Sequence, residues 1–390
     1  MVRKRLLIIT NRYPSGPNDF ASPFVHDLHS ELKQKGVVVD IVSPYYEPFR
    51  NDTRYIDESV HLFKWSDGKK VLSQLPLHNP GTCLKIFNYF RNGYKKAEEL
   101  IKTQDIAAIL ALWTLPSGYI AYRLSQRYEV PYAVWALGSD INSWAHLPVA
   151  GNLTMKVLHD ARILFADGYE LAMKVQRLSD RECHFLPSFH RLDYGRGIFG
   201  EEQNVFLFVG RMEKEKGIFD LLEAFRIFSQ NHKDWQLNYI GAGRAEKLLQ
   251  EKINKYGLEN SVKCFGYLER KALNHLTSLS AAIMIPSHSD SLPLTFGEAM
   301  QSGKPVITSD VGDLPFFVDK YRVGYHYPVH DIKALAGKME LMTGSRDNFT
   351  INCRKVLADL NIEISANTIM AWLETLIGPS VGSRHEYAAN

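Results

Sequence analysis

The sequence predicts an α/β protein with two consecutive domains, each a doubly wound parallel sheet, facing a central cleft. Three observations lead to this fold class. The chain has 390 residues, enough for two domains of ordinary size. Short apolar runs alternate with segments of helical periodicity, which is typical of βαβ units. This alternation breaks off near residue 188 and begins again near residue 204.

The first domain is expected over residues 1–190. RLLIIT reads as a buried parallel strand, and the helical stretch FVHDLHSELKQKG places Val25, Leu28 and Leu32 on one face. Gly36 ends that helix, and the strand VVVDIVSP completes a right-handed βαβ crossover. Further strands are expected at AAILALW, PYAVWALG, ARILFAD and CHFLP, and helices at GYIAYRLSQRY and LAMKVQRL.

Residues 188–203 are rich in glycine and charge without an apolar face, so we interpret them as the interdomain linker. The second domain is expected over residues 204–370. Its strands are expected at VFLFVG, QLNYIG, VKCFG, AAIMIPS and PVITSD, and its helices at DLLEAFRIFSQ, AEKLLQEKINKYG, LTFGEAMQSG and ALAGKMELMT. Residues 371–390 are expected to form a C-terminal helix and tail that pack back on the first domain.

Composition excludes several classes of protein. Hydrophobic residues make up 45% and charged residues 23% of the chain, which argues against a disordered or fibrous protein. The net charge of +3 is too small to imply a nucleic-acid partner by itself. The four cysteines lie far apart, without paired spacing for zinc, and are expected to be buried free thiols in a reducing compartment.

The N-terminal apolar run, residues 6–9, is too short for the core of a signal peptide, and no cleavage site follows it. No run of about 18 apolar residues occurs, so no membrane-spanning helix is expected. We therefore expect a cytoplasmic protein, located at the inner face of the membrane if it binds lipid.

The first candidate site follows the first strand of the second domain. In FVGRMEKEKG, Arg211 comes directly after the strand, and Lys216 lies beside Gly217, which permits an unusual backbone angle. Ligands bind beyond the carboxyl ends of strands in open parallel sheets, and two cations above a helix N-terminus suit a diphosphate. The alternative is a solvated charge run, because Glu213 and Glu215 alternate with the lysines.

The second candidate site is PSHSDSLPLTFGEAMQSGKPVITSDVGD, in which seven residues separate Asp290 from Glu298. Pro293 can set the first turn of a helix whose N-terminal amides favour an anion. Carboxylates near a phosphate suit the hydroxyl groups of a ribose or a hexose, because they only accept hydrogen bonds. The alternative is that Glu298 is an ordinary exposed helical residue.

FVGRMEKEKG and PSHSDSLPLTFGEAMQSGKPVITSDVG, with IGAGRAEKL and VKCFGYLER between them, resemble the family 4 glycosyltransferases. The likeness covers most of the second domain and extends more loosely to YPSGPNDFASPFVHDLHSELKQKG in the first. It implies the GT-B fold of two Rossmann-like domains and a retaining enzyme. That enzyme would move a hexosyl or N-acetylhexosaminyl group from a nucleotide-diphosphate-sugar to a hydroxyl acceptor, such as a lipid-linked, polysaccharide or glycoconjugate precursor.

The resemblance also implies roles for individual residues. Arg211 and Lys216 would bind the donor diphosphate, and Glu298 would accept hydrogen bonds from the ribose hydroxyls. Asp290 takes the place of the first Glu in the family's Glu-x7-Glu pair, which contacts the transferred sugar. The remaining donor contacts would be Gly210, then Tyr267 and Leu268 near the nucleobase, and Ser291, Leu292, Pro293, Leu294 and Thr295 near the phosphates and sugar.

Four departures from the family pattern stand out. Asp290 is one methylene shorter than the usual Glu. Asp313, after Gly312, replaces the second of two common glycines, and Phe316 stands where an acidic residue is frequent. In the first domain, NDFASPF replaces the Gly-rich donor loop and leaves Gly16 as its only glycine.

Two first-domain loops, WTLPSGYIAY and WALGSDINSW, each follow an expected strand. The residues expected to line the acceptor side of the cleft are Gly16, Thr114, Gly138, Ser139 and Asp140. Asp140 could equally cap the helix that begins at INSW. The catalytic histidine that is common in the family near this loop does not precede Gly138 here.

Segment 64–96 carries seven Lys and Arg residues against one acidic residue, Asp67, among several aromatics. A basic amphipathic face with aromatic residues is one signature of membrane-surface docking, so the segment is a candidate for peripheral contact with anionic lipid. The alternative is a packed helix with a solvated basic side.

Preorganised cations and amides can stabilise the charge that grows on a departing diphosphate. No Asp-x-Asp metal motif occurs, so neither a metal nor a cofactor is expected. The nearest alternative is a nucleotide-sugar epimerase of the same fold, and another is a non-catalytic nucleotide-sugar sensor. A third, a dinucleotide-dependent oxidoreductase, rests on IGAGRAE, which lacks the third glycine of that fingerprint and reads as a turn before a helix.

Overall fold

The computed structural model of the chain describes residues 5–48, 51–66, 68–69, 72, 75, 80–145, 147–192, 203–344 and 349–377. The chain forms two compact units. The first holds residues up to Ala166, then Ala172–Leu186 and the chain from Ile362 on, and the second holds Asp167–Leu171 and Pro187–Asn361. Each unit is built around one parallel sheet, which confirms the predicted fold class.

The sheet of the first unit has the strand order β3-β2-β1-β4-β5-β6-β7. Its strands are β1 (Arg5–Ile9), β2 (Val38–Pro44), β3 (Val60–Phe63), β4 (Ala108–Leu112), β5 (Tyr132–Ala136), β6 (Ile163–Ala166) and β7 (Cys183–Phe185). The strand order reverses between β1 and β4, and such a reversal leaves space for loops at the carboxyl edge of the sheet.

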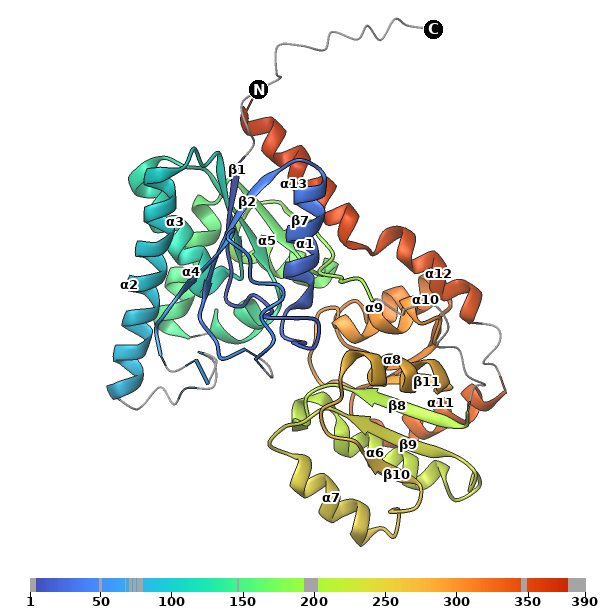
Figure 1. The fold of residues 1–390 in the computed structure, drawn as a ribbon. Coiled ribbons are helices and arrows are strands. Elements are labelled where there is room, and N and C mark those ends of the chain that lie inside the picture. Colours follow the sequence, from blue (N-terminus) through green and yellow to red (C-terminus); the bar gives the residue numbers. More distant parts are fainter. Residues whose placement is uncertain are drawn as a thin grey trace, which may run out of the picture. The chain divides into compact units, whose positions relative to one another are not determined.

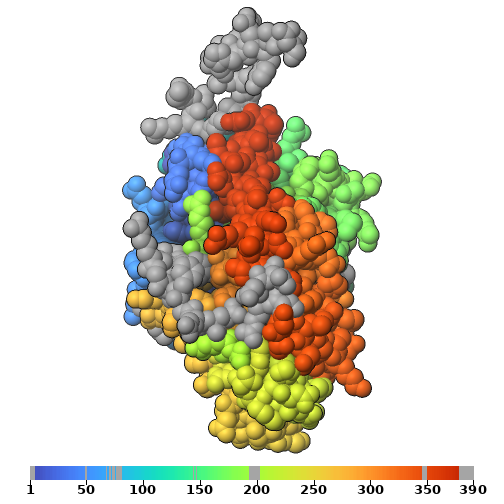
Figure 2. All heavy atoms as spheres, turned by 90° about the vertical axis from the view of Figure 1, so that its right-hand side faces the viewer, coloured from blue at the N-terminus to red at the C-terminus, as the bar shows by residue number. Residues whose placement is uncertain are grey.

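Helices cover both sides of this sheet (Figure 1). They are α1 (Pro23–Gln34), α2 (Pro80–Thr103), α3 (Tyr119–Tyr128), α4 (Pro148–Asp160), α5 (Tyr169–Ser179) and α13 (Ile362–Ile377). Val25, Leu28 and Leu32 of α1 are fully buried, as the periodicity predicts. Figure 2 shows α13, in red, lying against the blue α1, with which it packs.

The sheet of the second unit repeats the same strand order as β10-β9-β8-β11-β12-β13. Its strands are β8 (Val205–Val209), β9 (Gln236–Ile240), β10 (Val262–Cys264), β11 (Ala282–Ile285), β12 (Val306–Ser309) and β13 (Gly324–Tyr327). The reversal here falls between β8 and β11, which are direct neighbours. Both candidate motifs of the second unit follow these two strands.

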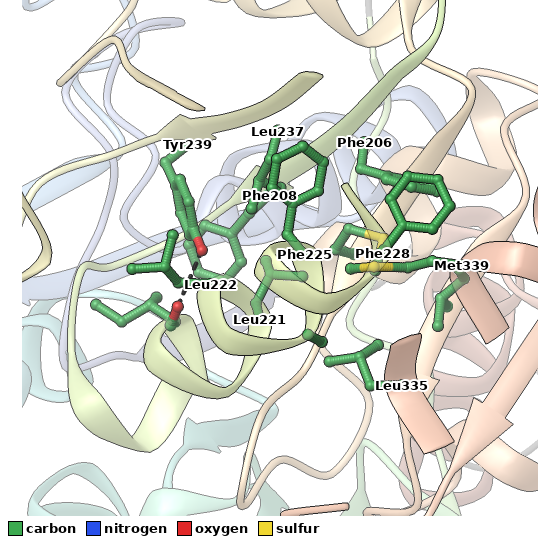
Figure 3. Close-up of a cluster of buried hydrophobic side chains, with 14 of the residues drawn as sticks. Phe206, Phe208, Leu221, Leu222, Phe225, Phe228, Leu237, Tyr239, Leu335 and Met339 are labelled. Atoms are coloured by element: carbon green, nitrogen blue, oxygen red, sulfur yellow. Dashed lines mark hydrogen bonds between the residues drawn. The ribbon is translucent and has the colours of Figure 1, made fainter. Parts of the chain in front are cut away.

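The helices of the second unit are α6 (Ile218–Phe228), α7 (Glu246–Lys255), α8 (Arg270–Leu279), α9 (Leu294–Gln301), α10 (Leu314–Tyr321), α11 (Ile332–Thr343) and α12 (Thr350–Asp359). Figure 3 shows the core between β8, β9 and α6, with α11 alongside. Phe206 and Phe208 of β8 pack there against Phe225 of α6, because alternate residues of a strand share one face.

The boundaries between the units differ from the expected ones. α13 begins at Ile362 and belongs to the first unit, because its buried residues Ile369 and Leu373 pack on that side. Ser188, Phe189 and His190, expected in a linker, are buried in the second unit. The rest of that expected linker, residues 193–202, lies outside the described residues, as do most of residues 67–79 and the tail from 378.

Several elements were not expected from the sequence: β3, β13, α4, α8, α10 and α12. β3 and β13 are sheet edges of four residues each with partly exposed side chains, so they lack the apolar runs that mark the central strands. The four cysteines are free thiols, but only Cys353 is buried as expected, whereas Cys183 and Cys264 are half-buried and Cys83 is exposed. Within the described ranges, no helix is both long and apolar enough to span a bilayer.

We expect Phe225→Ala to lower the free energy of unfolding of the second unit by about 3–5 kcal/mol, because it leaves a cavity in this core. Ile227→Ala, on the same helix but 37% exposed, is expected to cost less than about 1 kcal/mol. Differential scanning calorimetry compares the two variants, and equal shifts of the unfolding transition would contradict the placement of Phe225.

Candidate active site

A glycine holds the loop after β8 against the loop after β11. Gly217 has φ +67°, and a Cβ there would lie 1.8 Å from the carbonyl oxygen of Pro286. It stands between a short 3-10 helix, Lys214–Lys216, and the start of α6. The backbone N–H of His288 donates to the carbonyl oxygen of Glu215 at 2.8 Å. The two candidate motifs therefore meet at the reversal point of the sheet.

Lys216 and Asp290 form an ion pair at this point. Lys216 Nζ lies 2.8 and 2.7 Å from the two carboxylate oxygens of Asp290. The two side chains are 20% and 19% exposed, so water screens the pair only in part. Both line a small pocket of about 50 Å³ together with Gly210, Pro293 and Thr295. Lys216, expected to bind the diphosphate, and Asp290, expected to contact the sugar, are thus in direct contact.

Arg211, the other predicted phosphate ligand, is exposed. Unlike Lys216, it has no ion-pair partner among the side chains that the structure describes. It follows Gly210, whose backbone N–H donates to the carbonyl oxygen of Ile240 at 3.0 Å and so fixes the end of β8. Arg211 is therefore an exposed cation at the carboxyl edge of the sheet.

The N-terminus of α9 lies beside this pocket. Pro293 immediately precedes the helix with φ −67° and ψ 143°, one position earlier than a first-turn proline, and Leu294 is the first helical residue. The N-terminal amides of a helix attract anions. Ser291 Oγ is buried and has no hydrogen-bond partner within the described part of the chain, whereas the side chain of Leu292 is simply buried. This end of α9 therefore offers hydrogen-bond donors to an oxygen-rich anion.

Glu298 is held by a histidine and an arginine side chain. His190 Nε2 donates to its Oε1 at 2.8 Å, and Arg270 Nη1 donates to the same oxygen at 2.9 Å. The side chain of Glu298 is only 16% exposed, and that of His190 4%. Burial would raise the pKa of Glu298, but the hydrogen bond from His190 and the charges of His190 and Arg270 outweigh it and lower this pKa to about 2.

The same face of α9 fixes the chain around His190. Gln301 Nε2 donates to the carbonyl oxygen of His190 at 2.7 Å, and Leu192 N–H donates to Gln301 Oε1 at 2.9 Å. A Cβ on Gly297 would lie 2.1 Å from the ring of Phe189, so a glycine is needed for this ring to pack on α9. Residues 189–192 are thus part of the candidate site rather than a free linker.

The predicted nucleobase contacts lie beyond β10. Gly266 has φ +64° and accepts a hydrogen bond from Gly241 N–H at 2.8 Å, which ties the ends of β9 and β10 together. Tyr267 follows it and is 40% exposed, and Leu268 is half-buried. Arg270, the partner of Glu298, comes two residues later at the start of α8. The loop after β10 is therefore linked to Glu298 by the hydrogen bond from Arg270.

In the first unit, Asp140 joins two loops. Its carboxylate accepts hydrogen bonds from Thr114 N at 2.6 Å, Thr114 Oγ1 at 2.9 Å and Leu137 N at 3.2 Å. The residue is 1% exposed, and burial raises its pKa against the effect of these donors. Gly138, with φ +101°, and Ser139 form the turn between them. Asp140 holds the loops after β4 and β5 together, which neither sequence interpretation anticipated.

The loop after β1 is held in a similar way. Asp19 is 5% exposed and accepts hydrogen bonds from Ser15 N–H at 3.0 Å and Arg12 Nη2 at 3.2 Å. Gly16 lies against Asp52, whose carboxylate carbon would be 2.3 Å from a Cβ at that position. Gly16 therefore allows the loop after β1 to contact the segment between β2 and β3 closely.

Asp313, which replaces a common glycine of the family, accepts hydrogen bonds from the backbone amides of Tyr169 and Glu170. These two residues begin α5 and belong to the second unit. A carboxylate at a helix N-terminus is electrostatically favourable. Phe316, the other departure, is 49% exposed, and its ring lies 5.5 Å from that of Tyr169.

Sequence reasoning missed several residues of this region. His190 and Arg270 contact Glu298 from 108 and 28 residues away, distances at which no motif spacing can reveal them. It also missed a cluster of Asp220, His288 and His330 beside the β11 loop. The sequence signal that could have pointed to His288 is its place two residues before Asp290.

We expect Glu298→Gln to destabilise the second unit at neutral pH. The pKa of about 2, against an ordinary value of 4.5, corresponds to about 3 kcal/mol, and less where water screens the pair. Because the folded-state pKa is depressed, this stabilisation is complete above about pH 4.5 and is lost as the pH falls toward 2.

Urea unfolding at pH 7 and at steps from pH 5 to 3 measures the effect. The matched control is Glu251→Gln, an exposed glutamate of α7. The difference between wild type and Glu298→Gln should shrink toward pH 3, and a constant difference would contradict the charge pairing.

Comparison with known proteins shows which proteins this chain resembles. Residues 196–355 match the family model of glycosyl transferases group 1. The chain is 23% identical over 341 residues, 82% of its length and 84% of the relative's, to TuaC of Bacillus subtilis (strain 168), a glycosyltransferase named for teichuronic acid biosynthesis.

Two solved structures share the fold. Sucrose-phosphate synthase from Thermosynechococcus elongatus superposes with a TM-score of 0.77 at 18% identity, covering 96% of this chain and 99% of that one. HepE of Anabaena in complex with UDP gives a TM-score of 0.71 at 14% identity, covering 95% and 100%. Residues 196–355 therefore match the glycosyl transferases group 1 family, and the chain has the GT-B fold.

Proposed function

We propose that this protein is a retaining glycosyltransferase of family 4 that uses a nucleotide-diphosphate-sugar donor and a hydroxyl acceptor. The observation that carries the proposal is the cationic site at the reversal between β8 and β11. There Lys216, Arg211 and the N-terminus of α9 lie at one edge of the sheet, beside two carboxylates. The donor would be a hexosyl or N-acetylhexosaminyl nucleotide.

The diphosphate is the leaving group of the reaction. As the bond between the anomeric carbon and the phosphate oxygen breaks, negative charge grows on the diphosphate. Lys216, Arg211 and the α9 amides would stabilise that charge in fixed positions, which is the largest catalytic contribution a site of this kind makes. In this proposal these groups act without a metal ion or a cofactor.

The Lys216–Asp290 pair suits an exchange of partners. A diphosphate carries more negative charge than the Asp290 carboxylate, so it would draw the Lys216 ammonium to itself. Asp290 would then accept hydrogen bonds from hydroxyls of the transferred sugar. The two side chains are each about one-fifth exposed, and water weakens the attraction between them. Breaking the Lys216–Asp290 ion pair therefore costs little free energy.

The other donor contacts follow the same edge of the sheet. Glu298, oriented by His190 and Arg270, would accept from the ribose hydroxyls. Backbone groups would complete the donor site, with phosphate and sugar contacts from Gly210, Ser291, Leu292, Pro293, Leu294 and Thr295, and nucleobase contacts from Tyr267 and Leu268. The first-unit residues Gly16, Thr114, Gly138, Ser139 and Asp140 would shape the acceptor side, mainly through their backbone.

Two relatives support the choice of substrates. HepE was solved in complex with UDP, and TuaC is named for teichuronic acid biosynthesis. These names favour a nucleotide-diphosphate-sugar donor and a polysaccharide or glycoconjugate acceptor, including lipid-linked precursors. Cytoplasmic nucleotide-sugars would supply the donor.

We expect Lys216→Ala and Arg211→Ala each to reduce sugar transfer about 10²–10³-fold with folding intact, because each removes one fixed positive charge from the departing diphosphate. Lys214→Ala is the matched control, since Lys214 is an exposed lysine in the same 3-10 turn. Near-normal turnover in either Lys216→Ala or Arg211→Ala would refute the assignment.

The assay presents UDP-, GDP- and ADP-sugars with and without a panel of acceptors. Nucleotide release that requires an acceptor marks a transferase. Free sugar released without acceptor marks the epimerase alternative, and binding without any release marks a nucleotide-sugar sensor.

We also propose that α2 contacts anionic membrane lipid. Leu84 and Phe87 are each 61% exposed, and Arg91 and Lys95 are exposed as well. The spacing of three, four and four residues puts these side chains on one face of the helix. The opposite face packs in the first unit through Tyr89, which is 1% exposed. A stripe with apolar side chains at one end and cations at the other suits a lipid surface.

We expect the wild-type protein to float with vesicles that contain anionic lipid at low salt and not with neutral vesicles. Leu84→Ser/Phe87→Ser and Arg91→Glu/Lys95→Glu should each reduce flotation at least tenfold. Lys247→Glu/Lys255→Glu makes the same charge change on exposed lysines of the second unit and serves as the control. Flotation that all variants share equally would exclude α2 as the contact.

A further inference from the structure

Three side chains that bind metals converge beside the β11 loop, outside the proposed donor contacts. Asp220 lies in the first turn of α6, His288 in the loop after β11, and His330 in the loop after β13. One ligand atom from each lies within 4.8 Å of the others. This is the one such group of His, Cys, Asp and Glu among the described residues.

Both imidazoles are directed at a single carboxylate oxygen. His288 Nε2 lies 2.9 Å and His330 Nδ1 lies 3.1 Å from Asp220 Oδ2. Metal–ligand bonds of about 2.0–2.1 Å in tetrahedral geometry separate neighbouring ligand atoms by about 3.3 Å. The two nitrogen–oxygen separations are therefore a few tenths of an ångström shorter than those in a zinc site, and small side-chain rotations can supply the difference.

The backbone at His330 adds an independent observation. Its φ is +66°, a left-handed conformation that is uncommon outside glycine, although histidine adopts it more often than most residues, and that costs on the order of 1–3 kcal/mol. The residue is 65% exposed, so burial of its ring does not repay this cost. In this conformation the ring centroid of His330 lies 4.1 Å from that of His288. The ring planes are 60° apart, so the two rings are not stacked. A third metal ligand would account for the strained position.

The donor set and its exposure also fit a metal ion. Two imidazole nitrogens and one carboxylate are the ligands that Zn²⁺ and neighbouring divalent transition metals prefer. The side chains of Asp220 and His288 are 21% and 26% exposed, so an ion can enter and water can fill a fourth position. A histidine binds a metal ion as the neutral imidazole, so the ligands together carry one negative charge. A divalent ion carries two positive charges, so the occupied site has a net positive charge that attracts nearby anions.

We propose that Asp220, His288 and His330 form a binding site for one divalent transition metal ion such as Zn²⁺. The ion would join α6 to the loops after β11 and β13. The β11 loop already attaches to residue 215 through the backbone N–H of His288, and it carries Asp290 two residues further on. The metal therefore braces the loop that presents Asp290, and takes no catalytic step itself. The proposal holds whether or not the proposed transfer reaction is correct.

The test uses the full chain, freed of metal with a chelator and kept at pH 7.5, above the ordinary pKa of histidine. Equilibrium dialysis against Zn²⁺ followed by metal analysis gives stoichiometry and affinity, and Co²⁺ reports coordination through its visible absorption. We expect one ion per chain at micromolar or lower free Zn²⁺. We also expect Zn²⁺ to raise the unfolding temperature, because it binds the folded state.

His288→Ala and His330→Ala should each weaken the affinity at least tenfold, and both should abolish the thermal shift. His330 is largely exposed, so its replacement leaves the fold intact, which circular dichroism checks. The matched control is His326→Ala. His326 of β13 also contacts carboxylates, but its two nitrogens face Asp310 and Asp319 separately and cannot converge on one ion.

Two results would overturn the proposal. One is the absence of Zn²⁺ and Co²⁺ binding to the wild-type chain at micromolar free metal, which would leave the cluster as hydrogen-bonded side chains only. The other is binding that persists with equal affinity in His288→Ala and His330→Ala, which would place the ion elsewhere on the chain.

Discussion

The candidate site depends on one close approach of two backbone segments. The carbonyl oxygen of Pro286 occupies the space in which any Cβ at position 217 would stand, and the φ of +67° there excludes most residues other than glycine. This contact joins the loop after β8 to the loop after β11 at the reversal of the sheet. Lys216 precedes the contact and Asp290 follows it, so the same backbone approach brings cation and carboxylate to 2.7 Å. The pocket, the start of α6 and the N-terminus of α9 are all positioned around it.

Three of the charged side chains of the site, Lys216, Asp290 and Glu298, already have partners before any substrate arrives. Lys216 pairs with Asp290, and Glu298 is held by His190 and Arg270. The two arrangements differ in strength. The first is partly exposed and bridges two loops, so a stronger anion can compete for the lysine. The second is nearly enclosed and depresses the pKa of Glu298 to about 2, so it keeps that carboxylate ionised and oriented over a wide pH range. One pair is suited to exchange partners, and the other is suited to stay in place.

The first unit shows how polar residues expected to bind ligand can instead build loops. Asp140 accepts three hydrogen bonds from Thr114 and Leu137, and Asp19 organises the loop that contains Gly16. Such buried carboxylates satisfy backbone N–H groups that would otherwise remain unpaired in irregular segments. The loops beyond β1, β4 and β5 thus keep fixed shapes.

The sequence by itself determined the alternation of strands and helices, and the faces of helices such as α1. It also determined that Arg211, Lys216 and Asp290 lie in loops after strands and that Glu298 lies in the helix that follows. These follow from local periodicity and from motifs within a few tens of residues, because side-chain direction repeats with the period of the element. Only the tertiary structure decided which charges meet. His190 reaches Glu298 from a segment that resembles a linker in composition, and Asp220, His288 and His330 come from three separate elements. Contacts of this kind are set by strand order and by close backbone approaches, and neither leaves a spacing that can be read along the chain.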